Sequence, residues 1–128
     1  MIKIYTFQFN DADFLEYQQK TFKKFLKQEH ELICINNSFD KHHERQAIQD
    51  RAAALGIPHY FPENVDHSKG GYSHQTAIQW VWNNFIVNSN DKTIILDHDI
   101  FLIRDFAPDW NYDITGVMQG RGEHIKYF

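Results

Sequence analysis

The segment TIILDHDIFLI, residues 93–103, brings two aspartates to the end of an apolar run. The β-branched and apolar residues before Asp97 predict a buried strand, and Asp99 follows one residue later. Two carboxylates this close repel each other, and each is more stable in water or beside a cation. Mg²⁺ and Mn²⁺ take oxygen ligands and can bridge carboxylates to substrate phosphates. We therefore expect Asp97 and Asp99 to be metal ligands; the alternative is a solvated turn after a strand.

A second D-x-D occurs at residues 11–13, so the motif alone carries little information. Asp11 and Asp13 follow a strand-like segment, but they also open a helical pattern. Acidic side chains stabilise the amino end of a helix dipole. We interpret this copy as structural.

Asn36, Asn37, Ser38 and Asp40 come directly after the second apolar strand pattern. Their side chains can hydrogen-bond the edge of a base or a ribose. The same residue types are common in any strand-to-helix turn. The sequence leaves both interpretations open, with Asn36, Asn37 and Asp40 as candidate ligand contacts.

The segment Lys69-Gly70-Gly71-Tyr72-Ser73 precedes a third helical pattern. Glycines allow close approach of a ligand to the backbone, and a helix amino end favours an anion. The spacing is not that of a P-loop, and no G-x-G-x-x-G is present. A flexible loop with a serine cap remains the alternative for Lys69, Gly70 and Ser73.

The sequence contains eight histidines, of which His74 is the strongest candidate for the site. It follows the expected Ser73 cap and is predicted to face the same rim as the two aspartates after residue 96. His98 is expected to point to the opposite side of the strand. His42 and His43 lie among charged residues, which favours a solvated face, and no zinc-like His-x₃-His or Cys-x₂-Cys spacing occurs.

Strand and helix patterns alternate along the chain. The predicted strands cover residues 2–9, 32–35, 57–61 and 93–96, with a continuation at 100–103 and a fifth strand at 112–118. Helices capped by Asn10 or Asp11, by Asp40 and by Ser73 follow the first three strands. This order predicts one α/β domain, residues 1–128, with a Rossmann-like, mostly parallel sheet and helices on both faces. Ligands of such sheets bind at the carboxyl ends of the strands.

Composition narrows the function classes. Aromatic residues make up 16% of the 128 residues and the formal net charge is −4, without a basic patch typical of nucleic-acid binding. The single cysteine, Cys34, lies in an apolar run and is expected to be a buried thiol. Without a signal-peptide pattern or an apolar run long enough to span a bilayer, the sequence favours a soluble cytoplasmic protein with no transmembrane segment.

The strand KIYTFQFN near the start, together with TIILDHDIFLI after a Ser-capped helix, resembles the nucleotide-sugar-binding half of GT-A-fold glycosyltransferases. The resemblance implies that Asp97 and Asp99 hold Mn²⁺ or Mg²⁺ on the diphosphate of the donor, with Asp97 close to that donor. It places Asn36, Asn37 and Asp40 near the nucleoside, and Lys69, Gly70, Ser73 and His74 near the sugar. The acceptor would be the hydroxyl group of a glycan or another molecule.

The resemblance covers nearly the whole chain, but only as the first half of the family's fold. The segment from Tyr112 to Phe128 resembles the stretch that leads to the acceptor side. We expect the acceptor half, which carries the general base of inverting members, to be missing. Self-association through aromatic residues such as Tyr127 and Phe128 is a further expectation.

Two other functions remain open. Phosphatases of the haloacid-dehalogenase type also end an apolar strand in D-x-D, where the first aspartate is a nucleophile. In those enzymes the motif belongs on the first strand, whereas here it follows the fourth. The other alternative is a module that binds a nucleotide or a metal ion without catalysis.

Overall fold

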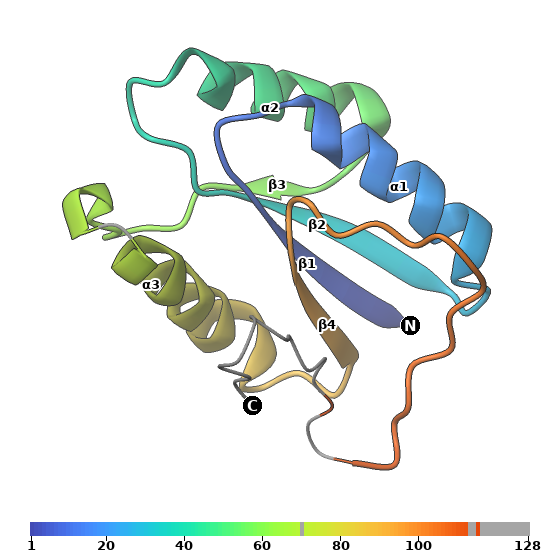
Figure 1. Ribbon diagram of the computed structural model, residues 1–128. Coiled ribbons are helices and arrows are strands. Elements are labelled where there is room, and N and C mark those ends of the chain that lie inside the picture. Colours follow the sequence, from blue (N-terminus) through green and yellow to red (C-terminus); the bar gives the residue numbers. More distant parts are fainter. Residues whose placement is uncertain (70, 113–114, 116–128) are drawn as a thin grey trace, which may run out of the picture.

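The computed structural model describes residues 1–69, 71–112 and 115. Strands and helices alternate in it, as Figure 1 shows. The strands are β1 (Ile2–Gln8), β2 (His30–Asn36), β3 (His59–Tyr60) and β4 (Lys92–Asp97). The helices are α1 (Asp13–Phe25), α2 (His43–Leu55) and α3 (Gly71–Val81), with a 3₁₀ turn η1 (His67–Lys69) and a π-helical turn η2 (Trp82–Ile86).

The four strands form one parallel sheet in the order β3-β2-β1-β4. The central strand β1 pairs with β2 from Ile2 opposite His30 to Gln8 opposite Asn36. On its other side it pairs with β4, and Phe7 lies opposite Asp97. This arrangement confirms the α/β, Rossmann-like fold that the alternation of patterns predicts.

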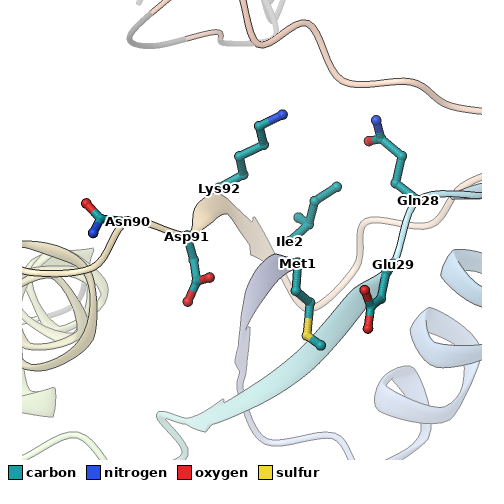
Figure 2. A pocket seen from close by; sticks show the side chains of 7 residues that line it. All are labelled: Met1, Ile2, Gln28, Glu29, Asn90, Asp91 and Lys92. Carbon is teal, nitrogen blue, oxygen red and sulfur yellow. The ribbon is translucent and has the colours of Figure 1, made fainter.

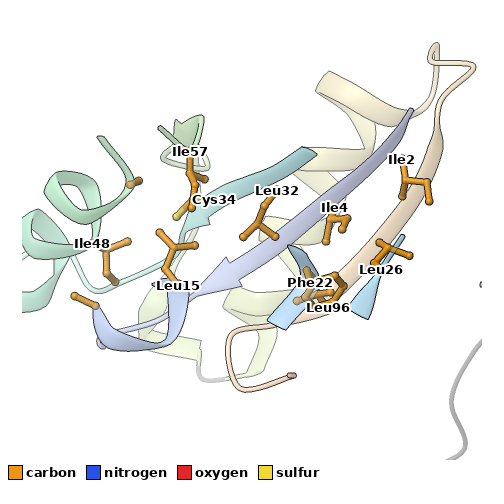
Figure 3. Close-up of a cluster of buried hydrophobic side chains, with 12 residues drawn as sticks. Ile2, Ile4, Leu15, Phe22, Leu26, Leu32, Cys34, Ile48, Ile57 and Leu96 are labelled. Carbon is orange, nitrogen blue, oxygen red and sulfur yellow. The ribbon is translucent and has the colours of Figure 1, made fainter. Parts of the chain in front are cut away.

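Helices cover both faces of the sheet, as expected. Helices α1 and α2 lie on one face and α3 lies on the other (Figure 1). Because side chains alternate along a strand, Ile2 and Ile4 of β1 point towards α1 and α2, while Tyr5 and Phe7 point towards α3. Figure 3 shows the core under α1 and α2; its buried residues are Ile2, Ile4, Ala12, Leu15, Phe22, Leu26, Leu32, Cys34, Ile48, Ala52, Ile57 and Leu96.

The three predicted helix caps are wrong. The N-cap of α1 is Ala12, without a side-chain cap hydrogen bond, rather than Asn10 or Asp11. Helix α2 begins at His43 rather than after Asp40, because His42 is the N-cap and its Nδ1 accepts a hydrogen bond from the Glu44 backbone N–H at 3.1 Å. Helix α3 begins at Gly71, so Ser73 lies inside its first turn.

The predicted structural role of the first D-x-D is confirmed. Asp11 Oδ1 accepts a hydrogen bond from the Asp13 backbone N–H at 2.9 Å. The Asp13 carboxylate itself lies 3.4 Å from the Arg51 guanidinium of α2. Both carboxylates therefore serve the start of α1 and its contact with α2.

The chain after β4 turns away from the sheet instead of continuing the strand at residues 100–103. Ile100 N–H donates to the Asp97 carbonyl at 3.3 Å and closes a turn. The chain then runs past α1, where Phe106 N–H donates to the Phe25 carbonyl at 3.0 Å (Figure 1). Of the fifth strand predicted at 112–118, only Tyr112 and Thr115 are described, and the rest lies outside the described residues, as do Tyr127 and Phe128.

Three single features of the structure remain to be described. Cys34 is fully buried, as expected. Gly56 ends α2 in the left-handed conformation, with φ of 69°, as a helix stop requires. Within residues 1–69 and 71–112, no helix is long and apolar enough to cross a membrane.

Candidate functional site

A pocket of about 360 Å³ opens at the carboxyl ends of β1 and β4. The residues that line it are Phe7, Phe9, Asn37, Ser73, His74, Asp97, His98 and Asp99. From β1 the chain crosses through α1 to β2, whereas from β3 it crosses through α3, on the opposite face, to β4 on the far side of β1. The carboxyl ends of β1 and β4 are thus the point where the connections diverge, which is where ligands of open α/β sheets bind.

His74 and Asp97 form the polar centre of this pocket. His74 Nε2 lies 3.0 Å from Asp97 Oδ1. The His74 ring also packs edge-on against Phe7 of β1, with centroids 5.3 Å apart. This contact helps to fix the orientation of the His74 ring. The two residues come from α3 and β4 and meet as the sequence predicts.

The hydrogen bond from His74 lowers the pKa of the Asp97 carboxyl below its ordinary value. Partial burial opposes this shift, and the charges of His74 and His98 add to it. Asp97 is therefore ionised at neutral pH and available to a cation. Its Oδ2 accepts no hydrogen bond within the described residues.

Asp99 lies on the turn after β4, exposed and beside the same pocket. Among the residues that the structure describes, no group of three or more His, Cys, Asp or Glu side chains converges on one point. Asp97 and Asp99 would thus be the protein's contribution to a cation that takes its other ligands from phosphate and water. That is the usual way in which Mg²⁺ is bound, and two carboxylates fit it.

In the turn after β2, Asn37 is a residue that lines the pocket. Its backbone N–H donates to the Gln8 carbonyl at 2.9 Å, which ties the end of β2 to the end of β1. His67 Nε2 lies 2.9 Å from the Asn37 carbonyl and 3.1 Å from Asn37 Oδ1, so it donates to both. Asn37 is thereby held from two sides.

The structure does not bring Asn36 or Asp40 to the pocket. Asn36 is fully buried; its Nδ2 donates to the Arg45 carbonyl at 2.9 Å and to His59 Nε2 at 3.0 Å. Its amide therefore fixes the turn after β2. Asp40 is exposed, with Oδ1 3.8 Å from Arg45 Nη1, and does not line the pocket.

The first turn of α3 contributes Ser73, which is buried and lines the pocket. Lys69 ends η1, and Gly70 lies outside the described residues. His98 borders the pocket, but its ring packs on the α1 side, as predicted, with its centroid 5.2 Å from that of Phe14.

Sequence reasoning missed Gln18, a fully buried residue of α1 that is bonded to the loop after β4. Its Nε2 donates to the carbonyls of Asp97, at 2.8 Å, and Ile100, at 3.1 Å. The signal was present: Gln18 lies between Leu15 and Phe22 on the buried stripe of α1. A polar residue on a core-facing stripe requires a partner.

A second hollow of about 310 Å³ lies at the opposite, amino ends of the strands. Figure 2 shows the side chains of Met1, Ile2, Gln28, Glu29, Asn90, Asp91 and Lys92 around it. None of the residues that the sequence singled out lies there. The candidate site is therefore the pocket at the carboxyl ends.

Comparison of the chain with protein-family models, with curated proteins and with solved structures gives no match.

Proposed function

We propose that this chain binds a nucleoside-diphosphate sugar together with Mn²⁺ or Mg²⁺ and is the donor-binding part of a glycosyltransferase. The observation that carries the proposal is the pocket at the divergence point of the sheet, which gathers two carboxylates after β4 and the first turn of α3. The cation bound there would neutralise the diphosphate leaving group.

The residues around the pocket suit different parts of such a donor. Asp97 and Asp99 supply oxygen ligands at one wall. The first turn of α3 supplies a positive dipole end and Ser73 at another, which suits a phosphate or a sugar hydroxyl. Phe7 and Phe9 provide an apolar floor.

The order of the strands favours this function over the phosphatase alternative. The motif Asp97-His98-Asp99 begins at the last residue of β4, beside the central strand, whereas the D-x-D after β1 serves the start of α1. A nucleophilic aspartate of the phosphatase type would belong on the first strand.

Titration calorimetry tests the proposal directly. The wild-type protein is titrated with UDP and with GDP, in the presence and absence of Mn²⁺. We expect one of the nucleotides to bind only with the metal. Asp97→Asn should weaken this binding at least about tenfold, because one charged cation ligand is lost.

Asp109→Asn is the matched control, since Asp109 is an exposed aspartate that does not line the pocket. It should bind like the wild type. Metal-independent binding, or equal binding by Asp97→Asn, would contradict the proposal. Binding without hydrolysis of a UDP- or GDP-sugar would indicate a module without catalysis.

A further inference from the structure

One face of α1 carries the loop that holds the two aspartates. Phe14, Tyr17, Gln18 and Thr21 follow one another at helical spacing and so lie on one side of α1. Each of them contacts residues 97–102, the segment that follows β4. This face adjoins the stripe of Leu15 and Phe22, which packs into the core.

The contacts are aromatic at the amino-terminal end of α1 and polar towards its carboxyl-terminal end. Phe14 packs against His98 and Phe101, with centroids 5.2 and 5.7 Å away, and Tyr17 packs against Phe101 at 6.4 Å. Thr21 Oγ1 accepts a hydrogen bond from the Leu102 backbone N–H at 3.3 Å. The loop is therefore held at several points along its length.

Gln18 makes the contact closest to the aspartates, and the orientation of its amide is determined. The carbonyls of Asp97 and Ile100 can only accept, so the group that faces them at 2.8 and 3.1 Å is Nε2. Oε1 then points into the core and accepts from Thr6 Oγ1 at 2.6 Å and from Gln8 Nε2 at 2.8 Å. Gln18 thus joins β1 to the turn after β4 through a buried network.

We propose that Gln18 is a positioning residue of the candidate site: by holding the carbonyls of Asp97 and Ile100, it sets the separation at which the carboxylates of Asp97 and Asp99 meet a cation. This inference rests on the proposed function for the identity of the ligand. Gln18 does not line the pocket in which the cation and the donor would bind. It acts on the backbone that carries both ligands.

Gln18→Met tests the inference, because methionine has nearly the same length but donates no hydrogen bond. The probe is Mn²⁺ with UDP or GDP, followed by the paramagnetic broadening of the amide signals of residues 97–100. In the wild type these signals should broaden first. In Gln18→Met the same broadening should need about 10- to 100-fold more Mn²⁺, the usual effect of losing a group that orients a metal ligand.

Two control variants separate positioning from general stability. Gln19→Met removes the neighbouring amide, which donates to the Leu55 carbonyl at 3.1 Å, away from the loop. Ile48→Val loosens the core under α2 without touching the loop. Both should require the wild-type concentration of Mn²⁺, whereas a shift as large as that of Gln18→Met would overturn the inference.

The failures of the two proposals can be told apart. If the wild type binds and Gln18→Met binds equally well, positioning is refuted and the proposed function stands. If the wild type shows no broadening, the proposed function fails and the inference fails with it. Should Gln18→Met not fold, Thr6→Val removes the hydroxyl that holds Gln18 Oε1. An unchanged Mn²⁺ requirement in that variant overturns the inference.

Discussion

At the scale of single residues, polar side chains inside this protein hold turns at the rim of the sheet. Asn36 fixes the turn after β2 and Gln18 fixes the turn after β4, both through amide groups that donate to backbone carbonyls. Amides suit this role because they satisfy two kinds of partner and carry no charge that burial would penalise. The rim is therefore determined from inside the core.

His59, which bonds to Asn36, makes the stability of the turn after β2 depend on pH. Burial, followed by the charge of Arg45, lowers the pKa of His59 below its ordinary value. In the folded protein its Nε2 must be unprotonated to accept the hydrogen bond from Asn36 at 3.0 Å. The unfolded chain binds this proton more readily, so the contribution of His59 to stability is present above about pH 6.5 and is lost as pH falls below that value.

We predict that His59→Gln flattens the pH dependence of stability. Glutamine can still accept from Asn36 but does not titrate. Urea unfolding at several values between about pH 5 and 7.5 should show that the wild type loses more stability on acidification than the variant. His43→Gln, at an exposed position, is the control and should follow the wild type. Parallel curves for the wild type and His59→Gln would refute the role of His59.

At the scale of elements, the ends of helices are where local chemistry can be measured. Gly56 ends α2 with φ of 69°, a conformation that costs residues with a Cβ atom about 1–2 kcal/mol. Nothing lies within 4 Å of the position that a Cβ would occupy. The cost of a substitution there is therefore conformational and not steric.

We predict that Gly56→Ala lowers the free energy of unfolding by about 1 kcal/mol. Gly56→Asn should lose less, since asparagine adopts the left-handed conformation more readily. Equilibrium unfolding in urea measures both. An alanine variant as stable as the wild type would mean that the end of α2 rearranges at no cost.

The strands and helices could be predicted from the sequence because each has its own period of apolar residues. Leu15, Phe22, Ile48 and Ala52 lie in the core as their spacing indicates. The N-caps of α1, α2 and α3 could not be predicted, because several polar residues in a row offer competing partners and only packing selects one. His42, rather than Asp40, caps α2 because the Asp40 carboxylate lies towards Arg45.

The candidate site was predictable in part. His74, Asp97 and Asp99 were found because strand ends and helix starts share one rim of a parallel sheet. The role of Asn36 could not be predicted, because a sequence does not show whether an amide after a strand points outwards or into the core. Gln18 was missed because the two backbone carbonyls that it holds lie 79 and 82 residues further along the chain, and no side-chain pattern records them.

At the scale of the whole molecule, both faces of the sheet depend on β1. Ile2 and Ile4 belong to the core under α1 and α2, while Tyr5 and Phe7 belong to the core under α3. Each core therefore contains residues of the same strand. Loosening one of them disturbs the strand that the other requires.

We predict that the protein unfolds in a single cooperative transition. Circular dichroism at the helix band and tryptophan fluorescence should give the same midpoint in urea. Leu15→Ala, under α1, should shift both midpoints together and cost about 2–5 kcal/mol. Two separate midpoints would show that the layers on the two faces melt independently.

The pairing of β4 with β1 makes the number of residues in β4 matter in its own way. Asp97 lies opposite Phe7 and meets His74 on the α3 side, while Leu96 fills the core on the other side. With Lys92 kept in place, removing one residue from the middle of β4 would reverse this parity: His98 would take the position beside His74, and the Asp97 carboxylate would enter the apolar layer. The connection before Lys92 can therefore change in length, whereas the number of residues from Lys92 to Asp97 cannot change by one without reversing the faces of the strand.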